Sequence, residues 1–443
     1  MHVCRRWRSI VFASPRRLDL KLYCTPRRSV NSQALDIWPE LPIVIYAQGM
    51  QSEKDVTNVI DALRHHDRVC QIYYQDMGSE HSTFLNKLAA IDEPFPALTA
   101  LELFAYRPNV PVLPDSFLGG SAPRLRSLRL WGIPYPSIGT LLSSTTDLVR
   151  LSLCRIPHSG YVAPETIVPC LPTLTRLESL ELGFQHPRSR DNRTSRHPPP
   201  LTRVVFPNLT SFDFHGDIEY LEDILSQIET PLLDRSEFDL FNQLVFDTPL
   251  LGHFIRRTEA FMTSHAARLE FHNILTTQAI RIGLLEREET ADGELDRHVR
   301  WLTISCKPLD WRRFSALTQV LNSFLSSLSM LESLKIGEVC DRGWEGKIEA
   351  VQWQELLHLF TAVKKLTLKS EFTVRLVAPA LQELAVERAT DVLPALQNLF
   401  LRTGDWRPSG PVKEAIEQFI AARQLCGHPV TVHYLGLEKC SDR

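Results

Sequence analysis

The sequence lacks the long hydrophobic runs and the one-sided charge that mark several large classes of protein. No stretch approaches the roughly eighteen consecutive apolar residues of a transmembrane helix, so none is expected. The apolar stretch at 10–13 is too short for a secretory signal peptide. The 443 residues carry 49 Lys and Arg against 52 Asp and Glu, a formal net charge of -3. This balance argues against a general binder of nucleic acid or of anionic membranes.

The nine cysteines also lack a recognisable framework. Their number is odd, and no two of them have the spacing CxxC. Several lie in apolar segments that resemble strands, where cysteine behaves as a small packing residue. We therefore expect reduced, buried thiols in a cytoplasmic or nuclear protein, and no disulfide scaffold.

Motifs that carry catalysis or cofactors are missing as well. The sequence contains no GxxxxGK[ST], no HExxH, no GxSxG and no glycine-rich dinucleotide turn. His65, His66 and Asp67 stand together, but they follow a helix-like stretch and are interpreted as a surface helix end. We expect no cofactor, no metal site and no catalytic residue, and an enzyme with an unrecognised site remains the third alternative.

A repeat is what the sequence does contain. The pattern L-x-x-L-x-L, in perfect or degenerate form, recurs every 23–33 residues until a last, shorter step. Its first positions are 69, 98, 125, 148, 177, 209, 233, 266, 299, 331, 363 and 381. The x-L-x-L part alternates apolar and polar residues, as a half-buried strand does. Most of the steps are typical of leucine-rich repeats, although no Asn or Cys recurs after the strand.

Helix-like stretches separate these strands. Apolar residues recur three and four apart in 56–66, 218–228, 314–328 and 353–363. One strand–helix unit cannot bury its own apolar face, whereas stacked units share a continuous core. The sequence thus predicts an α/β fold: a leucine-rich-repeat-like solenoid of strand–helix units with a parallel strand wall. Another α/β fold with leucine-rich strands is the alternative.

Three further segments are interpreted from composition. Residues 186–200 are basic and proline-rich, and residues 286–296 are acidic, so both are expected to be exposed loops. The first is either a solvated insertion or a docking loop for an acidic partner. Residues 413–425 read as an amphipathic helix that Gly427 ends, and 430–436 read as a strand. Together they would cap the open end of the solenoid.

The polar residues between the strand leucines are the candidate binding residues. They point away from the core and would line the concave face of a curved solenoid. Those selected are Ser127, Arg129, Arg150, Ser152, Ser179, Glu181, Ser211, Asp213, Arg235, Glu237, Arg268, Glu270, Trp301, Lys335 and Lys365. This mixture of charges suits a protein partner better than a phosphate backbone, which would require one sign of charge. For any single residue a merely solvated strand position is the favoured interpretation, and binding is favoured only for the array as a whole.

The opening residues, VCRRWRSIVFASPRRL at 3–18, resemble the C-terminal helix of an F-box. The segments at 18–45, 111–130, 156–165 and 219–234 are similar to a large fungal family of F-box proteins with degenerate leucine-rich repeats. The resemblance covers nearly the whole chain. It implies an adaptor whose F-box docks on the Skp1 subunit of a cullin–RING (SCF-type) ubiquitin ligase while the repeats hold a protein substrate. It assigns Val3, Cys4, Trp7 and Ile10 to the Skp1 side.

The match departs from that family at its start. An F-box begins with a Leu-Pro-x-Glu-x-Leu helix and a second helix, and neither precedes Val3 here. We therefore expect a remnant of the F-box C-terminal helix at 1–18, the irregular repeat solenoid at 19–410 and the helix–strand cap at 411–443. The expected function is a non-enzymatic substrate adaptor, with Skp1 as a partner if the F-box is complete in a longer protein. The alternative is a scaffold that lacks Skp1 binding. Neither nucleic acid nor membrane is an expected partner.

Overall fold

The computed structural model describes most of the repeat region. It covers residues 6, 21–27, 41–50, 53–76, 83–107, 110–187, 203–241, 248–258, 261, 263–274, 277–285, 300–306, 312–322, 328–340, 348–387, 391–402 and 407–435. The chain divides into two compact units, one of residues 1–213 with 226–232, the other of residues 214–225 with 233–443. Val3, Cys4, Trp7 and Ile10 lie outside the described residues, as do the acidic segment at 286–296 and most of the basic one at 186–200.

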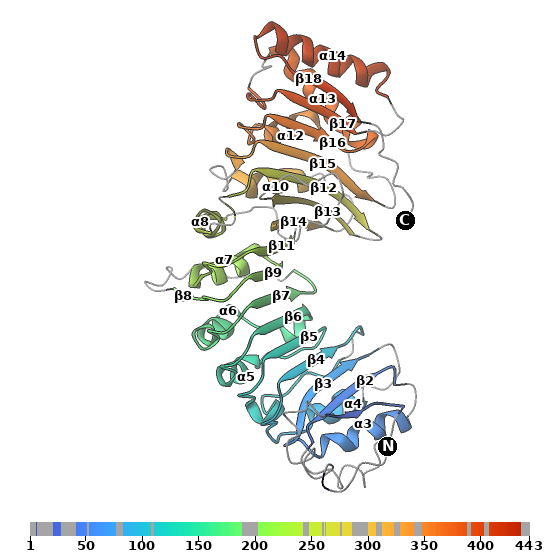
Figure 1. The fold of residues 1–443 in the computed structure, drawn as a ribbon, viewed down its shortest axis with the longest axis vertical. Coiled ribbons are helices and arrows are strands. Elements are labelled where there is room, and N and C mark those ends of the chain that lie inside the picture. Colours follow the sequence, from blue (N-terminus) through green and yellow to red (C-terminus); the bar gives the residue numbers. More distant parts are fainter. Residues whose placement is uncertain are drawn as a thin grey trace. The chain divides into compact units, whose positions relative to one another are not determined.

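The first unit is a run of parallel strands with helical segments between them (Figure 1). Its strands follow one another in space in the order of the sequence. They are β1 (Leu22–Cys24), β2 (Ile43–Gln48), β3 (Val69–Gln75), β4 (Ala100–Phe104), β5 (Ser127–Trp131), β6 (Arg150–Ile156), β7 (Ser179–Phe184) and β9 (Ser211–Gly216, whose last three residues belong to the second unit). Helices α3 (Glu53–Leu63), α4 (Thr83–Ala89), α5 (Ile138–Ser144) and α6 (Pro164–Ile167) and the 3-10 turns η1 (Phe117–Gly120), η2 (His158–Gly160) and η3 (Val168–Thr173) connect them. A small parallel pair joins β8 (Val204–Val205) to β10 (Ile228–Glu229).

The second unit has the same layers but a different strand order. Its strands run in space as β11 (Arg235–Phe241), β14 (Arg300–Cys306), β13 (Thr277–Leu285), β12 (Ala266–Ile274), β15 (Ser333–Cys340), β16 (Lys365–Leu368), β17 (Asn398–Arg402) and β18 (Thr431–Leu435). Its helices are α7 (Ile218–Gln227, whose last two residues belong to the first unit), α8 (Pro249–Arg257), α10 (Arg312–Asn322), α12 (Ala350–Leu357), α13 (Glu371–Glu387) and α14 (Gly410–Leu425). Helix α10 packs on β13 and β14, and α13 packs on β15.

The leucine triplets form the core, as the pattern predicts. Leu125, Leu128 and Leu130 are 0–3% exposed, and the triplets that start at 98, 148, 177, 209, 331 and 363 are buried to the same degree. The α/β, leucine-rich-repeat-like architecture is thereby confirmed. Among the described strands, the pairs from β1 to β7 and from β15 to β18 are parallel, and β13 is antiparallel to β12 and β14. Each triplet fills the space between its own strand and the helical layer.

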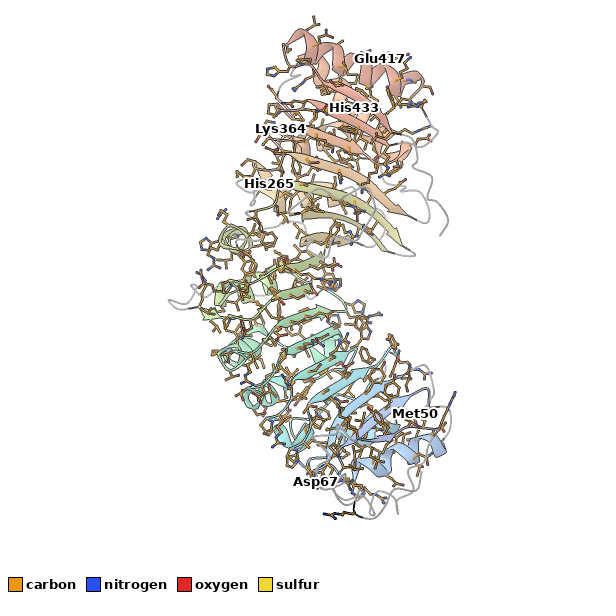
Figure 2. The ribbon with its side chains drawn as sticks, in the orientation of Figure 1. Met50, Asp67, His265, Lys364, Glu417 and His433 are labelled. Atoms are coloured by element: carbon orange, nitrogen blue, oxygen red, sulfur yellow. The ribbon has the colours of Figure 1, made fainter. Side chains whose placement is uncertain are left out.

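Backbone hydrogen bonds join each repeat to the next at the start of the strands. The carbonyl of Arg126 accepts the N–H groups of Val149 and Arg150 at 2.8 and 3.0 Å. The carbonyl of His265 accepts two N–H groups in the same way before β15, and the carbonyl of Glu332 accepts those of Lys364 and Lys365 before β16. Figure 2 labels His265 and Lys364, which occupy equivalent places in their repeats. The shared carbonyl fixes the register of neighbouring repeats.

One predicted strand is wrong. The triplet that starts at Leu381 lies in helix α13, and the strand of that repeat is β17. Leu396, Leu399 and Leu401 provide the missing L-x-x-L-x-L, 0–2% exposed, and lie 33 residues after the triplet of β16. Leu381 is buried as well, since a helix that covers a sheet also needs apolar residues three and four apart. The step from 363 to 381 is only 18 residues, against 23–33 for the other repeats, and this short step indicated that Leu381 does not begin a new strand.

The repeats at 266 and 299 do not follow one another in space in the order of the sequence. Strand β14 lies beside β11, and β12 lies beside β15, so the two are exchanged relative to the sequence. Strand β13, which the sequence analysis did not predict, runs antiparallel between them. Its outward positions include Gly283 and Ala279, and its inward positions Ile280, Ile282 and Leu284 are buried. A β12–β13 hairpin has thus been inserted into the row of parallel strands.

The C-terminal elements lie close to where the sequence places them. Helix α14 spans Gly410–Leu425, Gly427 follows with φ +78°, and β18 pairs in parallel with β17. Arg423 is fully buried, and its guanidinium donates to the carbonyls of Pro394 and Leu396 at 3.1 Å. Buried carbonyl groups require a hydrogen-bond donor. The guanidinium of Arg423 supplies it and so links α14 to the preceding repeat.

Two glycines at equivalent strand ends test how tightly neighbouring repeats pack. Gly49 follows β2 and Gly132 follows β5, with φ of +65° and +67°. A Cβ on Gly132 would lie 2.3 Å from the carbonyl oxygen of Ala105, whereas one on Gly49 meets nothing within 4 Å. We expect Gly49→Ala to reduce the free energy of unfolding by about 1 kcal/mol, the cost of a left-handed backbone. Gly132→Ala should cost a further 1–3 kcal/mol, roughly, because the neighbouring backbone must move. Urea unfolding of both variants measures the difference, and equal losses would contradict the close approach.

Candidate interaction face

The outer face of the sheet is the side of each strand that the helical layer does not cover. Strand alternation sends the leucines inward and the residues between them outward. In the first unit the register places Ser127, Arg150 and Ser179 in one row across β5, β6 and β7, and Arg129, Ser152 and Glu181 in the next. All six are half-buried or exposed. Ser211 and Asp213 lie at the corresponding outward positions of β9, both half-buried.

Hydrogen bonds and ion pairs link these side chains between repeats. The hydroxyl of Ser152 donates to a carboxylate oxygen of Glu181 at 2.6 Å. The guanidinium of Arg129 lies 3.7 Å from the carboxylate of Glu102 and 5.4 Å from the centre of the Phe104 ring. Opposite charges therefore alternate along the row and hold the side chains in place.

An aromatic band crosses the same face over strands β2 to β5. It consists of Tyr46, Tyr73, Phe104 and Trp131, with Tyr106 beside it. Tyr46 and Tyr73 stack at 4.6 Å with an angle of 8° between the rings, and Tyr73 lies 5.7 Å from Phe104. Tyr46 and Tyr106 remain 41% and 54% exposed. Exposed aromatic side chains that gather on neighbouring strands are unusual on a surface without a partner.

The sequence analysis missed this band. Phe104 and Trp131 each follow the last leucine of a triplet, which makes them direct neighbours across β4 and β5. That shared position in two successive repeats was the available signal.

A different arrangement occupies the outer face of the second unit. Glu270 on β12 was predicted to face a partner, but its side chain is 1% exposed. Arg281 donates to its carboxylate through Nε at 2.7 Å, His272 lies at 2.9 Å, and Arg268 makes a close ion pair with it. The antiparallel strand β13 brings Arg281 directly opposite Glu270, so neighbouring side chains close over the carboxylate. Glu270 is therefore a structural residue and not part of an open surface.

The cluster determines the protonation of this carboxylate. Burial alone would raise the pKa of Glu270, but the hydrogen bond from His272 and the charges of Arg268 and Arg281 outweigh it and lower the pKa to about 2. Arg281 also stacks on Trp301 of β14, with its guanidinium carbon 3.9 Å from the ring centre. Trp301 is half-buried, and Arg281 covers part of it.

The remaining predicted residues of this unit lie on the outer side of their strands. Arg235 and Glu237 on β11 form an ion pair at 3.7 Å, and both stay substantially exposed. Lys335 on β15 and Lys365 on β16 are half-buried. The ammonium of Lys365 lies 5.0 Å from the centre of the Phe400 ring, which stacks on His433 at 4.4 Å. His433 is labelled in Figure 2.

Reactive chemistry is not prominent in the part of the chain that the structure describes. No group of three or more His, Cys, Asp or Glu side chains there is arranged to hold a metal ion. Two cavities, each of about 10 Å³, are lined mainly by apolar residues such as Phe238 and Ile282 in the second unit and Leu130 and Ile138 in the first. Each is at most large enough for about one water molecule. Among the described helices, none is long and apolar enough to cross a bilayer.

The described cysteines behave as packing residues. Cys24, Cys70, Cys154 and Cys170 are buried thiols without a disulfide, and Cys426 is an exposed one. Burial raises the pKa of Cys154, and a hydrogen bond to Glu181 adds to the effect. A raised pKa keeps the thiol protonated and unreactive.

The Glu270 cluster predicts a stability change with pH. We expect Glu270→Gln to lower the free energy of unfolding at pH 7 by roughly 3 kcal/mol, because two half-buried guanidinium groups lose their buried counter-charge. Since the folded-state pKa lies below the ordinary value of 4.5, the cluster stabilises the fold above that value. This stabilisation is lost as the pH falls from 4.5 towards 2, and the variant should lack that dependence.

The exposed Glu237 provides the matched control. Glu237→Gln removes one surface ion pair and should cost less than about 1 kcal/mol. Chemical denaturation of the two variants between pH 7 and 3 makes the comparison. Equal losses, or an unchanged acid dependence in Glu270→Gln, would contradict the role assigned to the cluster.

Comparison with known proteins identifies no family for the chain. No protein-family model matches it. No curated protein matches it either. Among solved structures, the chain is similar to the crystal structure of a TLR13–ssRNA13 complex, with 13% sequence identity and a TM-score of 0.33. The alignment covers 87% of this chain and 46% of that one, so this chain spans less than half the length of its structural neighbour. The resemblance to fungal F-box proteins rests on the sequence motifs alone.

Proposed function

We propose that this protein is a non-enzymatic interaction module that holds a partner protein on the outer face of its repeats. The aromatic band of the first unit is the observation that supports this function most. Tyr, Trp and Arg are the residues that dominate binding energy in protein interfaces, because they bury a large area at a low entropic cost. Tyr46 and Tyr106 offer exposed rings, and Arg129 lies against Phe104 beside them.

The chemistry of the described titratable groups favours binding over catalysis. Glu270 is saturated by three cationic or hydrogen-bonding neighbours and has a pKa lowered to about 2, which makes it a poor general base at neutral pH. The thiol of Cys154 is held protonated. An unrecognised active site is the weaker alternative for this reason.

The finer proposal is that the module serves as the substrate-recognition subunit of an SCF-type ubiquitin ligase, in the cytoplasm or nucleus. The support is the likeness of residues 3–18 to the last F-box helix, in which Val3, Cys4, Trp7 and Ile10 match. A scaffold that does not bind Skp1 is the competing proposal.

Removal of two rings of the aromatic band should weaken partner binding. We expect Tyr46→Ala combined with Phe104→Ala to weaken capture of the partner at least tenfold, because the two rings that flank Tyr73 are removed from one surface. Affinity capture with quantitative mass spectrometry compares this variant with the wild type. Tyr434→Ala is the control, since Tyr434 is 47% exposed on β18, at the other end of the chain. A partner set that is unchanged in the double variant would refute the proposed role of the band.

Skp1 binding separates the two finer proposals. If the opening helix contributes, purified Skp1 should bind the chain, and Trp7→Ala should weaken binding at least tenfold, since Trp7 is its largest apolar residue. Isothermal titration calorimetry measures the affinity, with Tyr46→Ala as a control that should bind Skp1 normally. If the chain and a version extended upstream both fail to bind Skp1, the ligase role is excluded and the scaffold remains.

A further inference from the structure

Strand β18 has a neighbouring strand on one side only. It lies beyond β17 at the red end of the second unit (Figure 1), and none of the described strands lies on its other side. The N–H of Thr431 donates to the carbonyl of Gln397 at 2.8 Å, which fixes the direction of the backbone groups along β18. Successive residues of a strand point these groups to opposite sides. The N–H and C=O groups of Val432 and Tyr434 therefore point away from β17, towards the open edge.

The open edge of β18 lacks the features that protect edge strands. Such strands are usually very short, or they carry Lys, Pro or a β-bulge. Strand β18 reads Thr-Val-His-Tyr-Leu, and its five residues pair with β17 without a shift of register. The edge strand of the first unit, β1, has only three residues, with Lys21 before it and Pro26 shortly after it. Of these two edges, β18 is the one open to another strand.

Apolar side chains beside this edge are only partly covered. Val432 is in register with Leu399 and Tyr434 with Leu401, so both point to the helical side of the sheet. The two leucines are 0% exposed, whereas Val432 is half-buried and Tyr434 is 47% exposed. Leu435 is 41% exposed. The core side of the sheet thus ends in an apolar strip that a further strand would cover.

The residues of β18 complement a second copy of the same strand. In antiparallel strands, two directly opposite residues can exchange both of their backbone hydrogen bonds. A register centred on His433 places Val432 opposite Tyr434 of the partner subunit, and Tyr434 opposite Val432 of the partner subunit. This register pairs all the open backbone groups of both strands. It also joins a β-branched residue to an aromatic one, which is a favourable cross-strand pair.

The side chains around the edge do not oppose this pairing. Apart from His433, the residues of β18 carry no ionisable group that is charged at neutral pH. The ring of His433 stacks on Phe400 at 4.4 Å, and its Nε2 lies 3.1 Å from Oδ1 of Asn398, so it lies over β17 and not over the open edge. The guanidinium of Arg407 lies 5.2 Å from the centre of the Tyr434 ring, as a cation against an aromatic face. An edge lysine would repel its own copy, and β18 has none.

We propose that two copies of this protein pair through β18, as antiparallel strands related by a two-fold axis at His433. The contact joins the row of strands of one copy to that of the other. A strand of five residues buries less than the roughly 800 Å² per partner of a standard interface, so the dimer is weak, with a dissociation constant in the micromolar range. This inference needs no other partner protein and does not rest on the proposed interaction function.

Sedimentation equilibrium of the full chain between about 1 and 100 µM tests the dimer, and we expect a reversible monomer–dimer equilibrium. Tyr434→Pro removes an open N–H without removing a hydrogen bond to β17, and should raise the dissociation constant at least tenfold. Tyr23→Pro is the matched control. The N–H of Leu22 donates to the carbonyl of Pro42 at 2.8 Å, so the N–H of Tyr23 points to the free edge of β1. This variant should dimerise like the wild type.

Three results of this measurement would overturn the proposal. They are a chain that stays monomeric at all concentrations, a folded Tyr434→Pro variant that dimerises normally, and a dimer that only Tyr23→Pro disrupts. The last result would place the contact at β1. Circular dichroism establishes that each variant is folded, and none of these results bears on capture of a partner by the aromatic band.

A disulfide trap tests the register and does not depend on the proline variant. Opposite residues outside the hydrogen-bonded pairs have Cα atoms about 4.5 Å apart, which lies within the range of disulfides. His433→Cys should therefore form a disulfide-linked dimer under mild oxidation, in a background where the exposed Cys426 is replaced by Ser. Thr431→Cys should not, since Thr431 lies opposite Leu435 of the partner subunit. Peptide mapping by mass spectrometry identifies the bridge. No bridge at 433, or an equal yield at 431, would overturn the two-fold pairing.

Discussion

The fold depends on each strand having a neighbour that covers its leucines and its backbone groups. Leu128 is fully buried in β5, which has β4 on one side and β6 on the other. The carbonyl before each strand accepts two N–H groups of the next repeat, which fixes the register by geometry as well as by burial. A row of such units is stable because no unit has to bury its apolar face alone.

This constraint leaves the outer face available for other chemistry. The inward positions and the backbone hold the strands together, so the outward positions tolerate aromatic rings in one unit and a closed charge cluster around Glu270 in the other. The aromatic band offers exposed apolar area, whereas the Glu270 cluster is closed by its own arginines and offers little.

Buried polar residues mark the places where the repeat is irregular. Glu222 of α7 is 1% exposed, and its carboxylate accepts the N–H groups of Leu250 and Leu251 at the start of α8. Arg423 satisfies two carbonyls beneath α14. Glu270 anchors the inserted β12–β13 hairpin through Arg281. In each case a charge replaces a contact that the regular repeat would have supplied, and a charge without its partner would be costly to bury.

The sequence by itself determined the leucine-rich-repeat-like layers and the side of each strand that faces the core, because burial with a period of two is a local property. Leu125, Leu128 and Leu130 required no further information. Tertiary structure alone decided the exchange of β12 and β14, the helical state of Leu381 and the burial of Glu270. These features depend on which strands pair, and pairing is set by contacts between residues far apart in the chain. The alternation of residues in β12 is the same whether Arg281 or solvent lies opposite.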